Sequence, residues 1–206
     1  MIDMALIDKC ADPSLTPAIV EQFIKTAGSD DPLAISVKVG GRLVLIPKPT
    51  DPEMGLAAVR NYVGQASVRV GITQFPAGVG ITETSQLTPE IFDACSNLRM
   101  GTALFAKVAR IVTKWYGRPT NKEVLPQMID DTIYAWRTGV FEGTSVFQAD
   151  DPGGPTLIGG EPPKPAEPAE DERTSDLAMP TEGRQPEIKD AGQASIRVNL
   201  SRIGVK

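Results

Sequence analysis

The side chains of this chain that could do chemistry are scattered aspartates and glutamates and two cysteines, because the sequence contains no histidine. Without histidine, catalytic triads with a histidine base and most zinc sites are excluded. A glycine pair occurs in "VGGRL", but no Lys-Ser or Lys-Thr follows it, as a phosphate-binding loop requires. No single motif specifies a reaction, and we expect neither a metal nor a cofactor.

Cys10 and Cys95 have two interpretations. They could be two buried thiols of a cytosolic protein, or they could form one disulfide. A disulfide would close a long loop and stabilise the fold by about 4–5 kcal/mol in the chain-entropy model. Cysteine number and spacing alone leave both interpretations open.

Composition limits the partners and compartments of the chain. Its 206 residues carry a net charge of −5, which gives nucleic-acid binding no electrostatic support. No apolar run approaches the roughly 18–20 residues that span a membrane. The first residues, "MIDMALIDKCADPSL", do not resemble a signal peptide, because the start is not basic and Asp3 and Asp8 interrupt the apolar region. As written, the protein begins in the cytoplasm, unless export uses another route or an upstream start codon.

The elements that must position these side chains are mainly helical. Helices are expected to begin where a capping residue precedes proline, at Thr16-Pro17, Asp51-Pro52 and Thr88-Pro89. Alternating apolar residues on both sides of Gly40-Gly41 predict a β-hairpin, and "ASVRVGI" predicts a further strand. Apolar spacing predicts helices over about residues 17–27, 52–63, 98–117 and 125–137. The expected fold class is α+β, predominantly helical, with a small β-hairpin.

Composition also divides the chain into three parts. Residues 1–150 contain every aromatic residue and form the expected folded domain. Residues 151–192 are rich in proline, glycine and glutamate, and we expect a disordered linker there. Residues 193–206, "QASIRVNLSRIGVK", are basic and strand-like and repeat part of "QASVRVGI" at 65–72. This repeat is either a coincidence of common strand residues or a tail strand that pairs with a sheet edge or docks on a partner.

An ordered series of segments resembles a known family. The series contains "DDPLAI" after the first predicted helix, then "GGRL", "VGITQF", "DACSNLRMG" and "AWRTG". This order is similar to that of the lysozyme-like lytic transglycosylases of type IV secretion and conjugation systems, over roughly residues 5–145. The whole chain more closely resembles the TraH family of Ti-type conjugative plasmids, through "DPLAISVKVGGRLVLIPKP", "VRVGITQFPAGVGI" and "DACSNLRMGTALFAKVARIVTKWYG". The resemblance implies a lysozyme-like fold of the soluble lytic transglycosylase type.

The resemblance aligns Ala27 with the family's catalytic glutamate. That glutamate protonates the glycosidic oxygen and then accepts the proton of the sugar's own 6-hydroxyl, which an alanine cannot do. Trp136 matches an aromatic position that could stack on a sugar, although it could equally be a core residue of its helix. The glycan-binding residues that the resemblance implies are Gly71, Gln74, Trp136 and Gly139.

Other carboxylates could replace the missing glutamate. Glu21 lies six residues before Ala27, so it points about 240° around the helix from it. Asp30 and Asp31 follow the helix end, where aspartates ordinarily accept hydrogen bonds within the turn. Glu83 follows the "GITQ" segment and could approach a cleft, so it is the weak candidate for a relocated acid.

The resemblance further implies a disulfide between Cys10 and Cys95 and a periplasmic location, with the cytoplasm as the alternative because no signal peptide is visible. We therefore expect a conjugal transfer protein that is a non-catalytic lytic-transglycosylase homologue and binds peptidoglycan or components of the transfer apparatus. One alternative is an active peptidoglycan lytic transglycosylase with a relocated acid. Another is a cytosolic interaction protein unrelated to the cell wall.

Overall fold

The structure is a computed structural model, and it describes residues 2–157. The predicted strand-like segment 193–206 and most of the predicted linker 151–192 lie outside the described residues. Within residues 2–157 the fold is α+β, mainly helical with a small antiparallel sheet, which confirms the expected class. No helix of this described part is long and apolar enough to cross a lipid bilayer.

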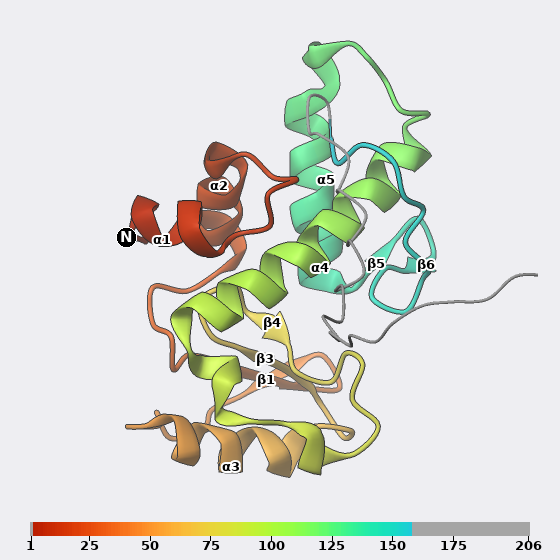
Figure 1. Ribbon diagram of the computed structural model, residues 1–206. Helices are drawn as coiled ribbons and strands as arrows, with labels where there is room; N and C mark the ends of the chain where they lie inside the picture. Colours follow the sequence, from red (N-terminus) through yellow and green to blue (C-terminus); the bar gives the residue numbers. More distant parts are fainter. Residues whose placement is uncertain (1, 158–206) are drawn as a thin grey trace, which may run out of the picture. The chain divides into compact units, whose positions relative to one another are not determined.

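One part of the fold is a group of helices that pack on one another. Figure 1 shows α4 crossing α5, with α1 and α2 to one side. The aromatic centre of this group is a stack of Phe23 on Phe105, whose ring centroids are 4.0 Å apart, with the Trp136 ring edge-on at 5.1 Å from Phe23. The helices are α1 (Met4–Cys10), α2 (Pro17–Ala27), α4 (Ala94–Trp115) and α5 (Leu125–Thr138).

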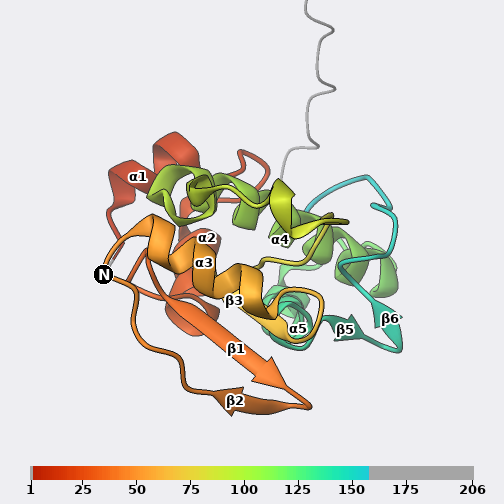
Figure 2. The ribbon, with the colours of Figure 1, turned by 90° about the horizontal axis from the view of Figure 1, so that it is seen from below.

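The second part is an antiparallel sheet covered by a helix. The strands follow the order β2-β1-β3-β4, and Figure 2 shows α3 lying along β1 and β3. Val37, Val59 and Val68 are buried between the sheet and α3. The elements are β1 (Ile35–Val39), β2 (Arg42–Val44), α3 (Pro52–Tyr62), β3 (Ser67–Val70) and β4 (Phe75–Pro76).

Short elements join and close these two parts. A second hairpin, β5–β6, follows α5 directly. The short elements are the 3-10 helices η1 (Thr84–Gln86), η2 (Pro89–Phe92) and η3 (Lys122–Val124), and the strands β5 (Val140–Phe141) and β6 (Thr144–Ser145).

Two helix starts differ from the expected pattern. Thr88-Pro89 begins only the 3-10 helix η2, and α4 starts later, at Ala94. The cap of α4 is Asp93, whose carboxylate accepts a hydrogen bond from the Ser96 backbone N–H at 2.8 Å. The short helix α1 was not expected, because its apolar residues are too few to show a helical period.

Cys10 and Cys95 form a disulfide in the structure. It joins the end of α1 to the first turn of α4. Since the two cysteines are 85 residues apart, the bond closes a loop that contains α2 and the whole sheet.

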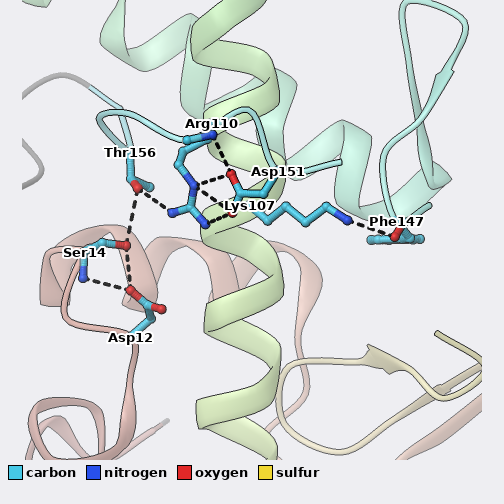
Figure 3. A network of polar contacts seen from close by, with 8 residues as sticks. Asp12, Ser14, Lys107, Arg110, Phe147, Asp151 and Thr156 are labelled. Carbon is cyan, nitrogen blue, oxygen red and sulfur yellow. Dashed lines mark hydrogen bonds and ion pairs between the residues drawn. The ribbon is translucent and has the colours of Figure 1, made fainter. Parts of the chain in front are cut away.

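Residues 146–157, which we call the strap, pack on α4 and the loop before α2 (Figure 3). The Arg110 guanidinium of α4 binds the Asp151 carboxylate through Nε–Oδ1 at 2.8 Å and Nη2–Oδ2 at 2.5 Å. Its Nη1 donates to Thr156 Oγ1 at 2.9 Å, and Thr156 in turn donates to Ser14 Oγ at 3.3 Å. Leu157 is buried in the helical core. The folded part therefore continues to Leu157, beyond the expected boundary at residue 150.

Candidate functional site

A cavity of about 270 Å³ lies beside the C-terminal end of α2. Its walls come from the end of α2, from β1 and β3, from the turn after β3 and from the end of α5. Ala27, which the resemblance aligned with a catalytic glutamate, and Gln74, which it implied as a glycan-binding residue, both line it. Three of its lining residues are cations, and none of the described lining residues is a carboxylate. The lining residues are Thr26, Ala27, Gly28, Ser36, Lys38, Arg69, Gln74 and Arg137.

The turn after β3 is held by the buried amide of Asn97 on α4. The Asn97 Nδ2 donates to Val70 O at 3.1 Å and to Ile91 O at 2.8 Å, while its Oδ1 accepts from the Thr73 backbone N–H at 2.9 Å. Gly71 has a φ of +71°, and a Cβ there would lie 2.3 Å from Asn97 Nδ2. Gly71, which the resemblance implied as a glycan-binding residue, does not line the cavity, and the side chain that approaches it closely is Asn97.

Two more glycines bring helices against the same turn. A Cβ on Gly28, at the end of α2, would lie 2.4 Å from Ile72 O. A Cβ on Gly101, within α4, would lie 2.1 Å from Thr73 Oγ1. The turn that carries Gln74 is thus in direct contact with both helices, which fixes the cavity wall.

Gln74 is buried, and both ends of its side-chain amide are engaged. Its Oε1 accepts from Ser36 Oγ at 2.6 Å, and its Nε2 donates to Gly71 O at 3.1 Å. A primary amide has two N–H groups and two acceptor lone pairs, so one of each remains for a ligand. The backbone of Gln74 has a φ of +51°, a conformation that non-glycine residues adopt rarely and often at functional sites.

Arg69 on β3 is a cation held by backbone carbonyls. Its Nη1 donates to Gln74 O at 3.1 Å, and its Nη2 donates to Trp136 O and to Arg137 O. The guanidinium also lies 5.7 Å from the Trp136 ring centroid and 5.6 Å from that of Phe147. Within residues 2–157 it forms no ion pair with a carboxylate. Burial, and then the positive charge of Arg137, lowers the pKa of Arg69 to about 10, so the group stays protonated at neutral pH.

Ser36, Lys38 and Arg69 were not predicted as cavity residues, although the sequence contained a signal for them. Ser36 pairs directly with Arg69 across β1 and β3. Lys38 is two residues further along β1, on the same face of the strand. The alternation of residues in "ISVKV" therefore indicated that the strand has a polar face. The position of this face beside Ala27 depends on the pairing of β1 with β3, which the alternation alone does not predict.

Trp136 and Gly139 have structural positions and do not line the cavity. Trp136 is fully buried against Phe23, Phe105 and Phe147, so its ring has no exposed face for a sugar. Trp136 is therefore a core residue of its helix, which was the alternative interpretation of this position. Gly139 ends α5 with a φ of +78°, and a Cβ there would lie 3.2 Å from the Phe147 ring.

The carboxylates considered as substitutes for glutamate lie elsewhere among the described residues. Glu83 is exposed at the start of η1, where its Oε2 accepts from Ser85 Oγ at 3.3 Å. Asp31 accepts from the Leu33 backbone N–H and pairs with Lys48 at 2.7 Å, and this hydrogen bond from Lys48 lowers the pKa of Asp31.

A second cavity, of about 390 Å³, contains the other two of these carboxylates. It is lined by Glu21 and Asp30 and shares Gly28 with the cavity beside Ala27. Glu21 therefore faces away from Ala27, as the helical angle predicted. In the part of the chain that the structure describes, no cluster of cysteine, aspartate and glutamate is arranged to hold a metal ion.

Comparison with known proteins gives two matches along nearly the whole chain. The sequence model of the TraH_2 family matches residues 1–205. A protein of Sinorhizobium fredii (strain NBRC 101917 / NGR234), described as "Uncharacterized protein y4dP", is 55% identical over 205 residues, which cover 99% of each chain. No solved structure matches the chain.

Proposed function

The chain belongs to the TraH_2 family, and from this membership we propose that it serves conjugal plasmid transfer as a non-catalytic, lysozyme-like relative of lytic transglycosylases. In this role it binds peptidoglycan or a component of the transfer apparatus. Family membership supports the part in conjugal transfer. The observation that carries the non-catalytic role is Ala27 in the wall of a cavity without a carboxylate among its described lining residues.

The chemistry of glycan cleavage explains why this observation matters. A glycosidic bond breaks through a transition state that needs a proton at the leaving oxygen. A positioned acid contributes about 10²–10⁴-fold to such a step, and the methyl group of alanine contributes no proton. Glu83, Asp31 and Glu21 do not line the cavity, so each would require a rearrangement to act there. Binding without turnover is the function that this arrangement supports best.

The periplasm is the compartment that goes with this proposal. The Cys10–Cys95 disulfide supports it, since disulfides form and persist in oxidising compartments. The test is alkylation of native donor-cell fractions with a thiol reagent. Two unmodified cysteines in the periplasmic fraction support the proposal, whereas two alkylated cysteines in the cytoplasmic fraction contradict it.

The function is tested with intact peptidoglycan sacculi and the purified, oxidised protein. Retention on sacculi is measured by sedimentation, and release of anhydro-muropeptides is measured by mass spectrometry. Ala27→Glu fills the cavity and adds a negative charge to it. Ala18→Glu makes the same change at an exposed position of the same helix and is the matched control.

We expect the natural protein and Ala18→Glu to sediment with sacculi, Ala27→Glu to lose this retention, and none of the three to release product. Release of anhydro-muropeptides by the natural protein contradicts the non-catalytic role and favours an active enzyme with a relocated acid. A protein that neither sediments with sacculi nor co-purifies with any transfer component contradicts the binding role.

A further inference from the structure

We propose that the cavity beside Ala27 is a binding site for one oxyanion, a carboxylate or a phosphate group, held by Lys38, Arg69 and Arg137. The inference deepens the proposed function and rests on it only for the source of the anion. It concerns a ligand group that binds to the chain and involves no reaction.

The first argument is charge. Three cationic residues line a cavity of about 270 Å³, and none of the described lining residues carries a negative charge. The cations repel one another, since the charge of Arg137 contributes to the lowered pKa of Arg69. An anion among them would replace this repulsion with attraction, and nearby opposite charge favours the protonated form of each cation. The positive charge of the residues that line the cavity therefore favours the binding of a negative group.

The second argument is the supply of hydrogen-bond donors. The carbonyls that hold Arg69 take at most three of the five N–H groups of its guanidinium. The oxygen atoms of a ligand can accept hydrogen bonds from the remaining N–H groups of Arg69, from one N–H of Gln74 and from the exposed cations of Lys38 and Arg137. Charge-assisted hydrogen bonds to a carboxylate or phosphate are about twice as strong as neutral ones. The three cationic side chains can only donate, which matches a ligand group that accepts.

The third argument is size. Pockets for drug-sized ligands commonly measure about 300–1,000 Å³, and this cavity is smaller. It therefore has room for one charged group and the neighbouring part of the molecule that carries it, rather than for a whole drug-sized ligand. Under the proposed function, that group is a carboxylate of the peptide stems of peptidoglycan. A phosphate group is the other source with the same chemistry.

The experiment measures binding to the full-length, oxidised protein by isothermal titration calorimetry at low ionic strength. One probe is inorganic phosphate, the second is a soluble disaccharide–tetrapeptide with free carboxylates, and the third is the same compound with its carboxylates amidated. The variants are Arg137→Gln and Lys38→Gln, since both side chains are exposed. Arg42→Gln removes the same charge from an exposed position on β2, outside the cavity, and is the control.

We expect binding of the free-carboxylate compound, at least about tenfold weaker binding by Arg137→Gln and Lys38→Gln, and less than about twofold change in Arg42→Gln. Amidation of the compound should abolish binding. Raising the ionic strength should weaken binding, because two of the cations are exposed.

The outcomes separate this inference from the proposed function. If phosphate binds through Arg137 and Lys38 but the protein ignores sacculi and the muropeptide, the oxyanion site stands and the peptidoglycan role fails. If sacculi are retained equally by Arg137→Gln and Arg42→Gln, the binding role stands and the oxyanion site is wrong. Equal binding of the free and amidated compounds, or no binding of any probe, also overturns the site.

Discussion

Replacing Asp151 with asparagine tests the ion pair that holds the strap on α4. The side chain of Arg110 is only 8% exposed, whereas that of Asp151 is 41% exposed. The Asp151→Asn change keeps the shape of the side chain and removes its charge. The Arg110 guanidinium then keeps its hydrogen bond to Thr156 but loses its counter-ion.

The magnitude follows from the burial of the two partners. Removing one member of a fully buried pair costs about 3–5 kcal/mol, because the other charge is left without compensation. Because Asp151 is 41% exposed, water already screens part of the pair, so we expect a loss of about 2 kcal/mol in the free energy of unfolding. With a urea dependence of about 2 kcal/mol per molar, the unfolding midpoint falls by about 1 M.

The effect must depend on pH in a defined direction. The hydrogen bond from Arg110 lowers the pKa of Asp151 below its ordinary value of 3.8. A carboxyl with a lowered folded-state pKa stabilises the fold above its unfolded-state pKa, and this contribution disappears as pH falls through the folded-state pKa. The difference between the natural protein and Asp151→Asn should therefore be complete at pH 7 and shrink below about pH 4.

The assay is urea unfolding followed by tryptophan fluorescence at pH 7 and pH 3. Asp31→Asn is the control, because the pKa of Asp31 is also lowered but its partner Lys48 is 76% exposed. Exposed pairs contribute about 0–1 kcal/mol, so the control should change little. Equal losses in the two variants, or a loss in Asp151→Asn that is the same at both pH values, would refute the reasoning.

Three further predictions concern the helical core. Reducing the Cys10–Cys95 disulfide, which spans 85 residues, should lower the free energy of unfolding by about 4–5 kcal/mol in the chain-entropy model, measured by urea unfolding with and without reductant; an unchanged midpoint would contradict this. Leu157→Ala should cost about 2–3 kcal/mol in the same assay, because Leu157 is buried in the core, and a loss below about 1 kcal/mol would show that the strap does not contribute. The Tyr116 hydroxyl donates to Asp131 at 2.6 Å, which raises the pKa of Tyr116 to about 12. In Asp131→Asn, ultraviolet titration should show this pKa moved toward 10. The contribution of this hydrogen bond to the stability of the fold should be present below pH 10 and lost as pH rises through about 12.

The helices and the first hairpin were predictable because local chemistry determines them. Asp51 caps α3 through its side chain, with proline in the next position, and α3 begins as expected. Gly40 and Gly41 both have positive φ, which the turn between β1 and β2 requires. The same reasoning failed at Thr88, where only the 3-10 helix η2 begins, because the side-chain cap of α4 is Asp93 and that helix starts directly after it.

The cavity was only partly predictable, because its cations depend on contacts between distant segments. The position of Ala27 at the end of its helix could be predicted from spacing alone. Arg69 acquires its surroundings from the carbonyls of Trp136 and Arg137 at the end of α5, 67 and 68 residues further along the chain. Helical spacing could not distinguish a buried Trp136 from an exposed one, since α5 is buried on one face and its neighbours were unknown.

The three cations also determine how a glutamate introduced at Ala27 would behave. A carboxylate introduced by Ala27→Glu would lie in the same cavity as Lys38, Arg69 and Arg137, and their charges would lower its pKa. It would stay ionised at neutral pH, whereas a general acid must carry a proton when the glycosidic bond breaks. Under the proposed function, glycan cleavage by this chain would therefore require both an acid in the cavity and the removal of positive charge from it. Ala27→Glu alone is therefore expected to leave the protein without cleavage activity.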